Sequence, residues 1–374
     1  MTQDDGSGKP RFLSFTMPRT LVFGDKAPAF LPRKNQSMTG ETFDEIIQAG
    51  TDGVLVDLQG HAVYYSQYLD HTFVTFVRRN GLTDPDTARH FNPKEPWPIG
   101  AKELKVSWKI VNPGEDTSGF FTTKAQIARL TYDANGHIVA DPSHPRAVTL
   151  ALVGFHVAGV VKGHPEMIWA TFEHKDNAPD VPHQGLSPNT IVSQRNWTFY
   201  RAGTPYRACN VNAAGNLTLN EETQTLSPVT EVCRVYAEGT DPGSTDPKDV
   251  KNRKAIRELN RSVHGQLKDV WANYFEVGAI WFKDGPKLAP DESLATDDLL
   301  TGSLKLSNST IETFTQTQST MNNCFRCHNT VQQFPPRAGL VALPGLDLNI
   351  SHAFVNIFFW SQEKKKELPA APKK

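Results

Sequence analysis

Two cysteines and a histidine in the last part of the sequence stand at a spacing that can attach a haem group. The stretch reads Cys324-Phe325-Arg326-Cys327-His328. At this spacing both thiols can add to the two vinyl groups of one porphyrin, and the adjacent histidine can bind the iron. The motif predicts one covalently bound haem c, attached through Cys324 and Cys327, with His328 as the proximal iron ligand.

Two other kinds of site also use a Cys-x-x-Cys pair. A four-thiolate zinc site needs a second close pair, but the other two cysteines, Cys209 and Cys233, are far apart in the sequence. A thioredoxin-like redox pair lies at the start of a helix in an early βαβ unit, whereas this pair comes late in the chain. Haem attachment is therefore the preferred interpretation.

The other two cysteines bear on the cellular compartment. Cys209 and Cys233 bracket a stretch rich in turn-forming residues and could form a disulfide, although two free buried cysteines would also fit. Haem c is attached outside the cytoplasm in bacteria, so the motif predicts a periplasmic protein that depends on the haem c maturation machinery. Residues 1–11 lack the apolar run of a signal peptide, so we expect that a leader was removed or omitted.

Three residues in the middle of the sequence are candidates for the second axial position of the iron. His156 shares a predicted strand face with apolar neighbours, Met167 shares one with Trp169, and His174 precedes a polar loop. A purely structural role is the preferred interpretation for each of them. The sequence therefore leaves the sixth ligand open.

Composition limits the class of protein. The chain has 374 residues and a formal net charge of -1, which argues against a nucleic-acid binder. No apolar stretch is long enough for a transmembrane helix. A simple electron carrier needs only about a hundred residues, so the length favours an enzyme or a subunit of a larger assembly.

The spacing of apolar residues predicts an α+β fold: a mainly antiparallel β-sheet with flanking helices and a C-terminal haem c attachment segment. We expect an N-terminal arm and helices over 1–95, a β-rich domain with a long loop excursion over 96–240, and a helical and haem-attachment region over 241–374. The last two could form one continuous domain. Strands are predicted at 54–56, 104–110, 120–123, 127–132, 148–161 and 167–172, and helices at 42–47, 64–77, 256–277 and 309–321.

Three features of the sequence carry a resemblance to a known family. They are the strand Pro98-Ile99-Gly100-Ala101-Lys102-Glu103-Leu104-Lys105-Val106, a hairpin-like stretch over 157–169, and the Cys-x-x-Cys-His motif followed by an aromatic segment. Together they resemble the cytochrome c′-beta family. Its members are β-sheet haem c proteins that bind nitric oxide or oxidise hydroxylamine, and the second kind carries a lysine cross-linked to the porphyrin. The resemblance makes Lys105, Lys109 and Lys162 candidates for contact with the haem.

The chain also looks like a broad set of bacterial mono-haem cytochrome c family proteins, which implies haem binding alone. Three functions fit these observations. The first is an electron carrier with a closed iron and an unknown electron-transfer partner. The second is an enzyme or gas sensor with an open distal site, for nitric oxide, hydroxylamine or peroxide. The third is a haem-bearing subunit of a larger complex.

Overall fold

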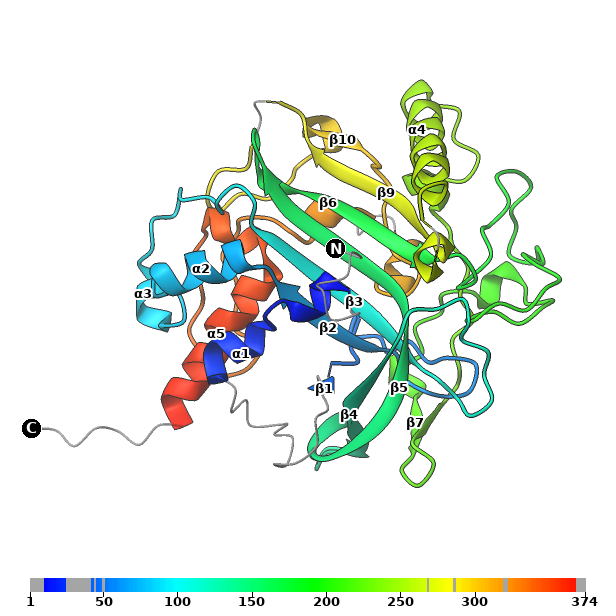
Figure 1. Ribbon diagram of the computed structural model, residues 1–374, viewed down its shortest axis with the longest axis horizontal. Coiled ribbons are helices and arrows are strands. Elements are labelled where there is room, and N and C mark those ends of the chain that lie inside the picture. Colours follow the sequence, from blue (N-terminus) through cyan, green and yellow to red (C-terminus); the bar gives the residue numbers. More distant parts are fainter. Residues whose placement is uncertain are drawn as a thin grey trace, which may run out of the picture.

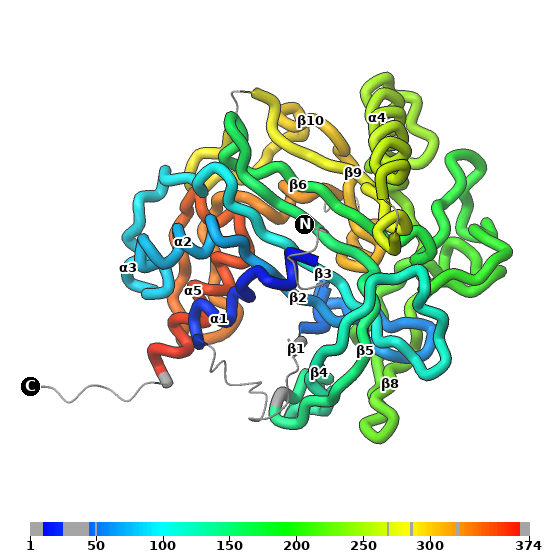
Figure 2. The backbone as a smooth tube through the Cα atoms, in the orientation of Figure 1, coloured from blue at the N-terminus to red at the C-terminus, as the bar shows by residue number. Residues whose placement is uncertain are grey.

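The computed structural model describes residues 10–24, 42–43, 45–48, 51–267, 269–284, 287–318 and 322–367. Within them, an eight-stranded, largely antiparallel sheet is flanked by five α-helices (Figures 1 and 2). The predicted α+β class is confirmed. Strands from 1–95, 96–240 and 241–374 all join this sheet, so the described parts of the three predicted regions share one framework.

The long strand β5 (Ile138–Val161) is the centre of the sheet. At Gly154 it pairs with β3 on one edge and with β6 on the other, while β4 pairs with its first half. Strand β2 lies beyond β3, β9 and β10 lie beyond β6, and β1 adds to β4 in parallel. The other strands of this sheet are β1 (Thr42–Phe43), β2 (Tyr64–Leu69), β3 (Lys102–Ile110), β4 (Thr122–Tyr132), β6 (His164–His174), β9 (Tyr274–Phe282) and β10 (Leu300–Gly302); β7 (Thr218–Asn220) and β8 (Thr225–Ser227) form a separate hairpin.

The helices cluster mainly at one end of the sheet. In Figure 1, α1, α2, α3 and α5 lie together there, and α4 stands beside β9. No described helix is long and apolar enough to cross a membrane. The helices are α1 (Pro18–Phe23), α2 (His71–Arg79), α3 (Pro85–Arg89), α4 (Pro247–His264) and α5 (His352–Glu367).

The two faces of the sheet have different coverings, because alternate residues of a strand point to opposite sides. One set of β3 side chains packs with Phe12 in an apolar core. The other set faces the chain that follows β10, where the hydroxyls of Ser107 and Thr310 lie 2.7 Å apart. The first set is Leu104, Val106, Trp108 and Ile110, and the second includes Glu103, Lys105 and Ser107. The segment that carries the Cys-x-x-Cys-His motif therefore covers the second face.

Most predicted strands are confirmed. The ranges 104–110, 148–161 and 167–172 lie within β3, β5 and β6, and 127–132 lies within β4, which also takes in 122–123. The range 54–56 contributes only isolated bridges, at Val54 and Val56.

The predicted helix over 64–77 is wrong in its first half. Most side chains of β2 are buried, on both faces of the sheet, so their apolar character does not alternate as in a half-exposed strand. A new element begins at Asp70, whose carboxylate accepts the Phe73 N–H at 3.0 Å and caps α2. Spacing alone did not separate a buried strand from a helix here.

The helices predicted at 42–47 and 256–277 are also corrected. Residues 42–43 form strand β1, and Glu45 makes a bridge to Tyr65. Helix α4 ends at His264, and the chain then turns into strand β9. Pairing with neighbouring strands overrides the local helical pattern in both places.

The predicted helix over 309–321 is a short 3₁₀ turn at Thr313–Thr317 in its described part. The capping box does not form, because its two members bind distant partners. The Ser309 N–H donates to Glu173 at 2.6 Å, and the Glu312 carboxylate meets His156. Contacts with the sheet therefore replace the helix cap.

Candidate functional site

The Cys-x-x-Cys-His motif folds into a single tight turn. A 3₁₀ helix spans Cys324–Arg326, and the N–H groups of Cys327 and His328 both donate to the Cys324 carbonyl, at 3.2 and 2.8 Å. Such a turn brings residues three and four apart close together. The two thiols and the imidazole are thus held in one small region.

The two residues between the cysteines anchor this turn. Phe325 is fully buried and meets the ring of Phe282 on β9 edge-on, with centroids 4.8 Å apart. Arg326 pairs with Asp297 at 2.7 Å and donates to the Leu294 carbonyl at 3.3 Å. Apolar packing on one side and an ion pair on the other fix the turn, so the thiols need not take part in holding it.

Both thiols of the motif are free and half-buried. Cys324 and Cys327 are not disulfide-bonded. Burial raises the pKa of Cys324 well above its usual value, and it raises the pKa of Cys327 to about 11. Reactive redox cysteines have lowered pKa values and an electropositive setting. These thiols are protonated at neutral pH and lack that activation.

The imidazole of His328 is oriented by a backbone carbonyl. Its Nδ1 lies 2.8 Å from the Ile350 oxygen, so a proton on Nδ1 is donated to that carbonyl. Burial lowers the pKa of His328 well below its usual range, so the ring is neutral. Nε2 is engaged by no described residue and keeps its lone pair. A neutral histidine with one nitrogen fixed in this way is the form that binds a metal through the other.

Two aromatic rings hold His328 in place. The rings of Trp169 and His352 each lie with their centroids 4.0 Å from it. Nε2 of His352 in turn lies 3.2 Å from the Cys327 carbonyl, and burial lowers the pKa of His352 to about 4. The motif is therefore packed between strand β6 and the start of helix α5.

A row of polar side chains crosses the sheet face on which the motif lies. The strand register places Gln67 opposite Lys105, Lys105 opposite His156, and His156 opposite Thr171. Directly paired residues project to the same side of a sheet. Trp169, which touches His328, is two residues from Thr171 on β6, so the polar row runs next to the motif.

The row contains a close acid–base pair. Nε2 of His156 lies 2.6 Å from Oε1 of Glu312, and the other carboxylate oxygen accepts the Asn308 N–H at 2.9 Å. Burial alone would raise the pKa of Glu312, but His156, the Asn308 N–H and Lys105 together hold it below its usual value. Glu312 is therefore ionised at neutral pH.

Lys105 carries the other charge of the row. Its Nζ lies 3.8 Å from Glu45 and 5.2 Å from the centre of the Tyr65 ring. Besides burial, its positive charge lowers the pKa of both His328 and His352. Besides burial, the negative charge of Glu312 raises the pKa of both motif cysteines. The row and the motif thus lie within electrostatic reach of each other.

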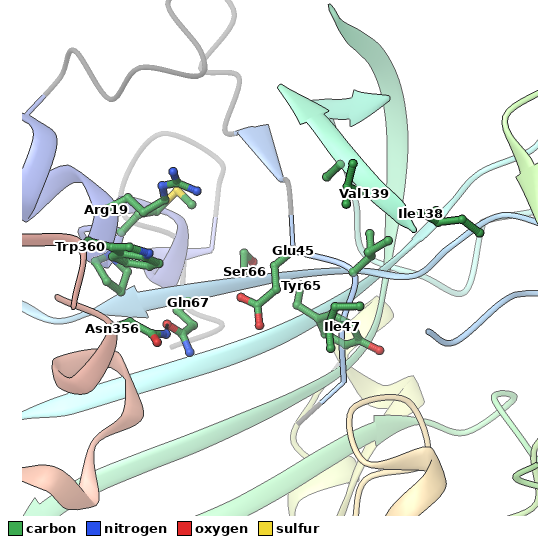
Figure 3. A pocket seen from close by; sticks show the side chains of 14 residues that line it. Arg19, Glu45, Ile47, Tyr65, Ser66, Gln67, Ile138, Val139, Asn356 and Trp360 are labelled. Carbon is green, nitrogen blue, oxygen red and sulfur yellow. Dashed lines mark hydrogen bonds between the residues drawn. The ribbon is translucent and has the colours of Figure 1, made fainter. Parts of the chain in front are cut away.

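A cavity of about 420 Å³ borders the β2 end of the row. Figure 3 shows Gln67 beside Asn356 and Trp360 of α5, with Glu45 and Tyr65 between these residues and Val139 of β5. Because Glu45 also pairs with Lys105, the cavity adjoins the charged part of the row. Its volume is within the range of small-molecule pockets.

The structure separates the three candidates for the second axial position. His156 lies in the polar row beside the motif. Met167 is fully buried in the apolar core that contains Phe325, so its side chain serves to pack that core. His174 uses both ring nitrogens, one toward the Gly119 carbonyl at 3.0 Å and the other toward the Asp176 N–H at 3.2 Å. His174 is therefore a structural residue.

The three candidate lysines are also separated. Lys105 belongs to the row, whereas Lys109 binds Glu115 at 2.7 Å and Asp57 at 3.6 Å. Lys162 is exposed at the turn between β5 and β6. Of the three, only Lys105 acts electrostatically on the motif.

Cys209 and Cys233 are joined by a disulfide, the pairing that the sequence suggested. The bond lies in the long excursion between β6 and α4, away from the polar row in the chain. It leaves Cys324 and Cys327 as the two free thiols.

Sequence reasoning missed two parts of this site. His352 and the Ile350 carbonyl reach the motif only through the fold, and no spacing in the sequence connects them with it. Glu312 was noticed only as a possible helix cap. Its partner, His156 on β5, is far away in the sequence, so no local pattern connects the two residues.

Among the described residues, no group of three or more His, Cys, Asp and Glu side chains is arranged to hold a metal ion. Comparisons with protein-family models, with curated proteins and with solved structures find no match to this chain.

Proposed function

We propose that the chain is a periplasmic mono-haem c-type cytochrome that acts in redox chemistry. In this proposal Cys324 and Cys327 hold the haem through thioether bonds, and His328 binds the iron. The observation that carries it is the hydrogen bond from His328 Nδ1 to the Ile350 carbonyl, which leaves Nε2 for a metal. The two free thiols in the same turn are the attachment points in this proposal.

The residues fit haem c better than they fit the other Cys-x-x-Cys chemistries. A redox pair would need a thiolate, and burial acts against one here. The disulfide between Cys209 and Cys233 agrees with an oxidising compartment, where haem c is attached. Bound haem supplies an iron that can change oxidation state and, where its second axial position is free, take up a small molecule.

Removal of the attachment points tests the proposal. We expect the Cys324→Ala/Cys327→Ala protein, matured in a host competent for haem c assembly, to hold no haem after denaturation. The Cys209→Ala/Cys233→Ala protein is the matched control, because it also loses two cysteines, here those of the disulfide, and should keep its haem. Covalent haem on the first variant would refute the proposal.

An enzyme or gas sensor with an open distal site is the second candidate. It is favoured by the polar row, because Lys105 and the His156–Glu312 pair offer charge and protons beside the motif. Ferrous spectra with and without carbon monoxide separate it from an electron carrier. A low-spin spectrum that carbon monoxide leaves unchanged supports the carrier, and a high-spin spectrum that shifts supports the open site.

The family resemblance adds one residue to this test. In the hydroxylamine-oxidising members a lysine is cross-linked to the porphyrin, and Lys105 is the candidate whose charge acts on Cys327 and His328. Proteolysis of the mature protein followed by mass spectrometry would then give a haem peptide that contains both Lys105 and the motif. A haem peptide with the motif alone would favour the nitric-oxide-binding side of the resemblance.

A further inference from the structure

Helix α4 concentrates positive charge that the chain as a whole does not have. The helix carries six of the 39 Lys and Arg residues and only two of the 40 Asp and Glu residues. Its formal net charge is therefore +4 (six minus two), while that of the whole chain is -1. In Figure 1 the helix stands at the outer edge of the molecule, beside β9. Charge gathered on one outlying element can select the surface on which a protein docks.

One row of uncharged and weakly basic side chains fixes α4 to the rest of the fold. Ile256 is the buried residue of the helix, and Asn260 makes two hydrogen bonds to the Glu276 backbone on β9, both 2.8 Å long. Asn252 and His264 extend the row by one turn at either end, where each binds a backbone carbonyl, at 3.1 and 2.8 Å. Intervals of four residues place this row on one face of the helix, and the row contains no Lys or Arg.

The opposite face of α4 carries a stripe of charges, which we call the basic stripe. Its members follow one another at intervals of three or four residues and are all exposed: Lys248, Lys251, Lys254, Glu258 and Arg261. Lys254 and Glu258 lie 3.8 Å apart. Within the described part of the chain, no residue forms an ion pair or hydrogen bond with the side chains of Lys248, Lys251 and Arg261. The stripe therefore offers unpaired cations to solvent.

The other two cations of α4 serve the fold. Arg253 donates to the Ser244 carbonyl at 2.7 Å, and Arg257 pairs with Glu238 at 2.8 Å. Both partners lie in the chain that precedes the helix. The unpaired positive charge of α4 is thus confined to the basic stripe.

Aliphatic side chains flank the basic stripe. Val250 lies on one side of it and is 48% exposed, and Leu259 and Val263 lie on the other side and are 46% and 41% exposed. Cations with aliphatic residues beside them are typical of helices that lie at a membrane interface. Protein–protein interfaces are instead enriched in aromatic residues and depleted of lysine, whereas α4 has three lysines and no Phe, Tyr or Trp.

We propose that the basic stripe docks the protein on an anionic membrane surface, with α4 lying along the lipid headgroups. The unpaired cations are complementary to lipid phosphates, and Lys and Arg near an anionic leaflet each add to the binding. The flanking aliphatic side chains then reach the edge of the acyl region. This docking uses no residue of the Cys-x-x-Cys-His motif and does not depend on haem.

Vesicle binding by the full chain tests the proposal. We expect the wild type to sediment with vesicles of equal parts phosphatidylglycerol and phosphatidylcholine but not with phosphatidylcholine alone, and added salt should weaken the binding. Lys251→Gln/Lys254→Gln/Arg261→Gln should bind about 100-fold more weakly, the scale for loss of three cations beside an anionic surface. Gln supports a helix nearly as well as Lys and Arg, so α4 should still form, which circular dichroism checks.

A matched variant separates the stripe from total charge. Arg79→Gln/Lys94→Gln/Lys124→Gln removes the same three charges from exposed residues outside α4 and should bind like the wild type. An equal loss in this control would show that total charge governs the binding and would overturn the proposal.

The remaining outcomes are also decisive. A wild type that ignores the anionic vesicles refutes membrane docking. If it binds poly-glutamate instead, and the stripe variant does not, the stripe is a docking surface for an acidic protein and the membrane assignment is wrong. Covalent haem is measured on the same samples, so a chain without haem that still binds the vesicles would refute the haem proposal and support this inference.

Discussion

Glu103 is an acid buried beside the motif segment. It lies on β3, is 8% exposed, and accepts a hydrogen bond from the Ser351 hydroxyl, next to the carbonyl that orients His328. Burial raises its pKa from 4.5 to about 7. The folded protein therefore holds this proton at pH values where the unfolded chain has lost it, and stability falls as pH rises from about 4.5 to about 7.

This predicts a pH-dependent stability that one substitution changes. The shift of pKa corresponds to about 3 kcal/mol of unfolding free energy lost by pH 8. Glu103→Gln keeps an acceptor for Ser351 and removes the ionisation, so this loss should disappear and the variant should be the more stable protein above pH 7. Guanidinium unfolding at a series of pH values measures it.

A second buried acid provides the comparison. Burial also raises the pKa of Glu276 to about 7, and this group should keep its own slope in the Glu103 variant. Equal pH slopes for wild type and Glu103→Gln would show that Glu103 ionises normally in the folded protein.

Single residues differ in how far their role can be read from sequence. The spacing of Cys324, Cys327 and His328 alone is enough to predict haem attachment, and this stays a prediction. His156 was visible only as one of several candidates, because its partner Glu312 is far along the chain. His352 gave no signal, since its place beside His328 depends on where α5 begins.

At the scale of elements, Arg234 ties strand β6 to two loops. Its Nη2 lies 2.8 Å from Glu173 on β6, and Nη1 donates to the Ala178 carbonyl at 3.3 Å and pairs with Asp180. Glu173 also accepts the Ser309 N–H at 2.6 Å. The guanidinium thus supports the segment that carries Glu312.

Loss of this guanidinium should be costly, because it leaves the Glu173 carboxylate buried without its partner. We expect Arg234→Ala to lower the free energy of unfolding by about 3–5 kcal/mol. Arg257→Ala breaks the more exposed pair with Glu238 and should cost no more than about 1 kcal/mol. Chemical denaturation compares the two, and similar losses would show that burial adds nothing at Arg234.

The strands differ in how clearly the sequence shows them. Strand β3 alternates apolar residues with Lys105, Ser107 and Lys109, so its period was plain. Strand β2 is buried on both faces, and its tyrosines and leucine mimic a helical stripe. Strand β9 follows a real helix, and the change of period falls in the short 3₁₀ turn at Val270–Asn273. Where both faces are covered, periodicity carries little information.

At the scale of the whole molecule, the disulfide closes the long excursion between β6 and α4. It joins Cys209 to Cys233 over a sequence separation of 24. A loop of this length should contribute roughly 3 kcal/mol by restricting the unfolded chain. We expect Cys209→Ala/Cys233→Ala to lose about that much stability in denaturant titrations. Thiol labelling of the denatured, unreduced wild type should leave both residues unmodified, and labelling of both would disprove the bond.

The polar row and the motif come from segments that are far apart in the sequence. Gln67, Lys105 and His156 lie at least 168 positions before Cys324 (324 − 156), while the motif follows β10. The site exists only when the later segment lies on the sheet.

That arrangement sets an order of events in time. Cys324 and Cys327 are only partly exposed once the segment has docked, and Trp169 and His352 then pack against the neighbouring His328. In the haem c proposal, an attachment enzyme would therefore reach the thiols more easily before docking. All eight strands of the main sheet precede the motif in the chain, so the sheet could be paired before the motif segment packs onto it. In the haem c proposal, haem attachment would then precede the final folding step, in which the segment that carries the motif packs onto the sheet.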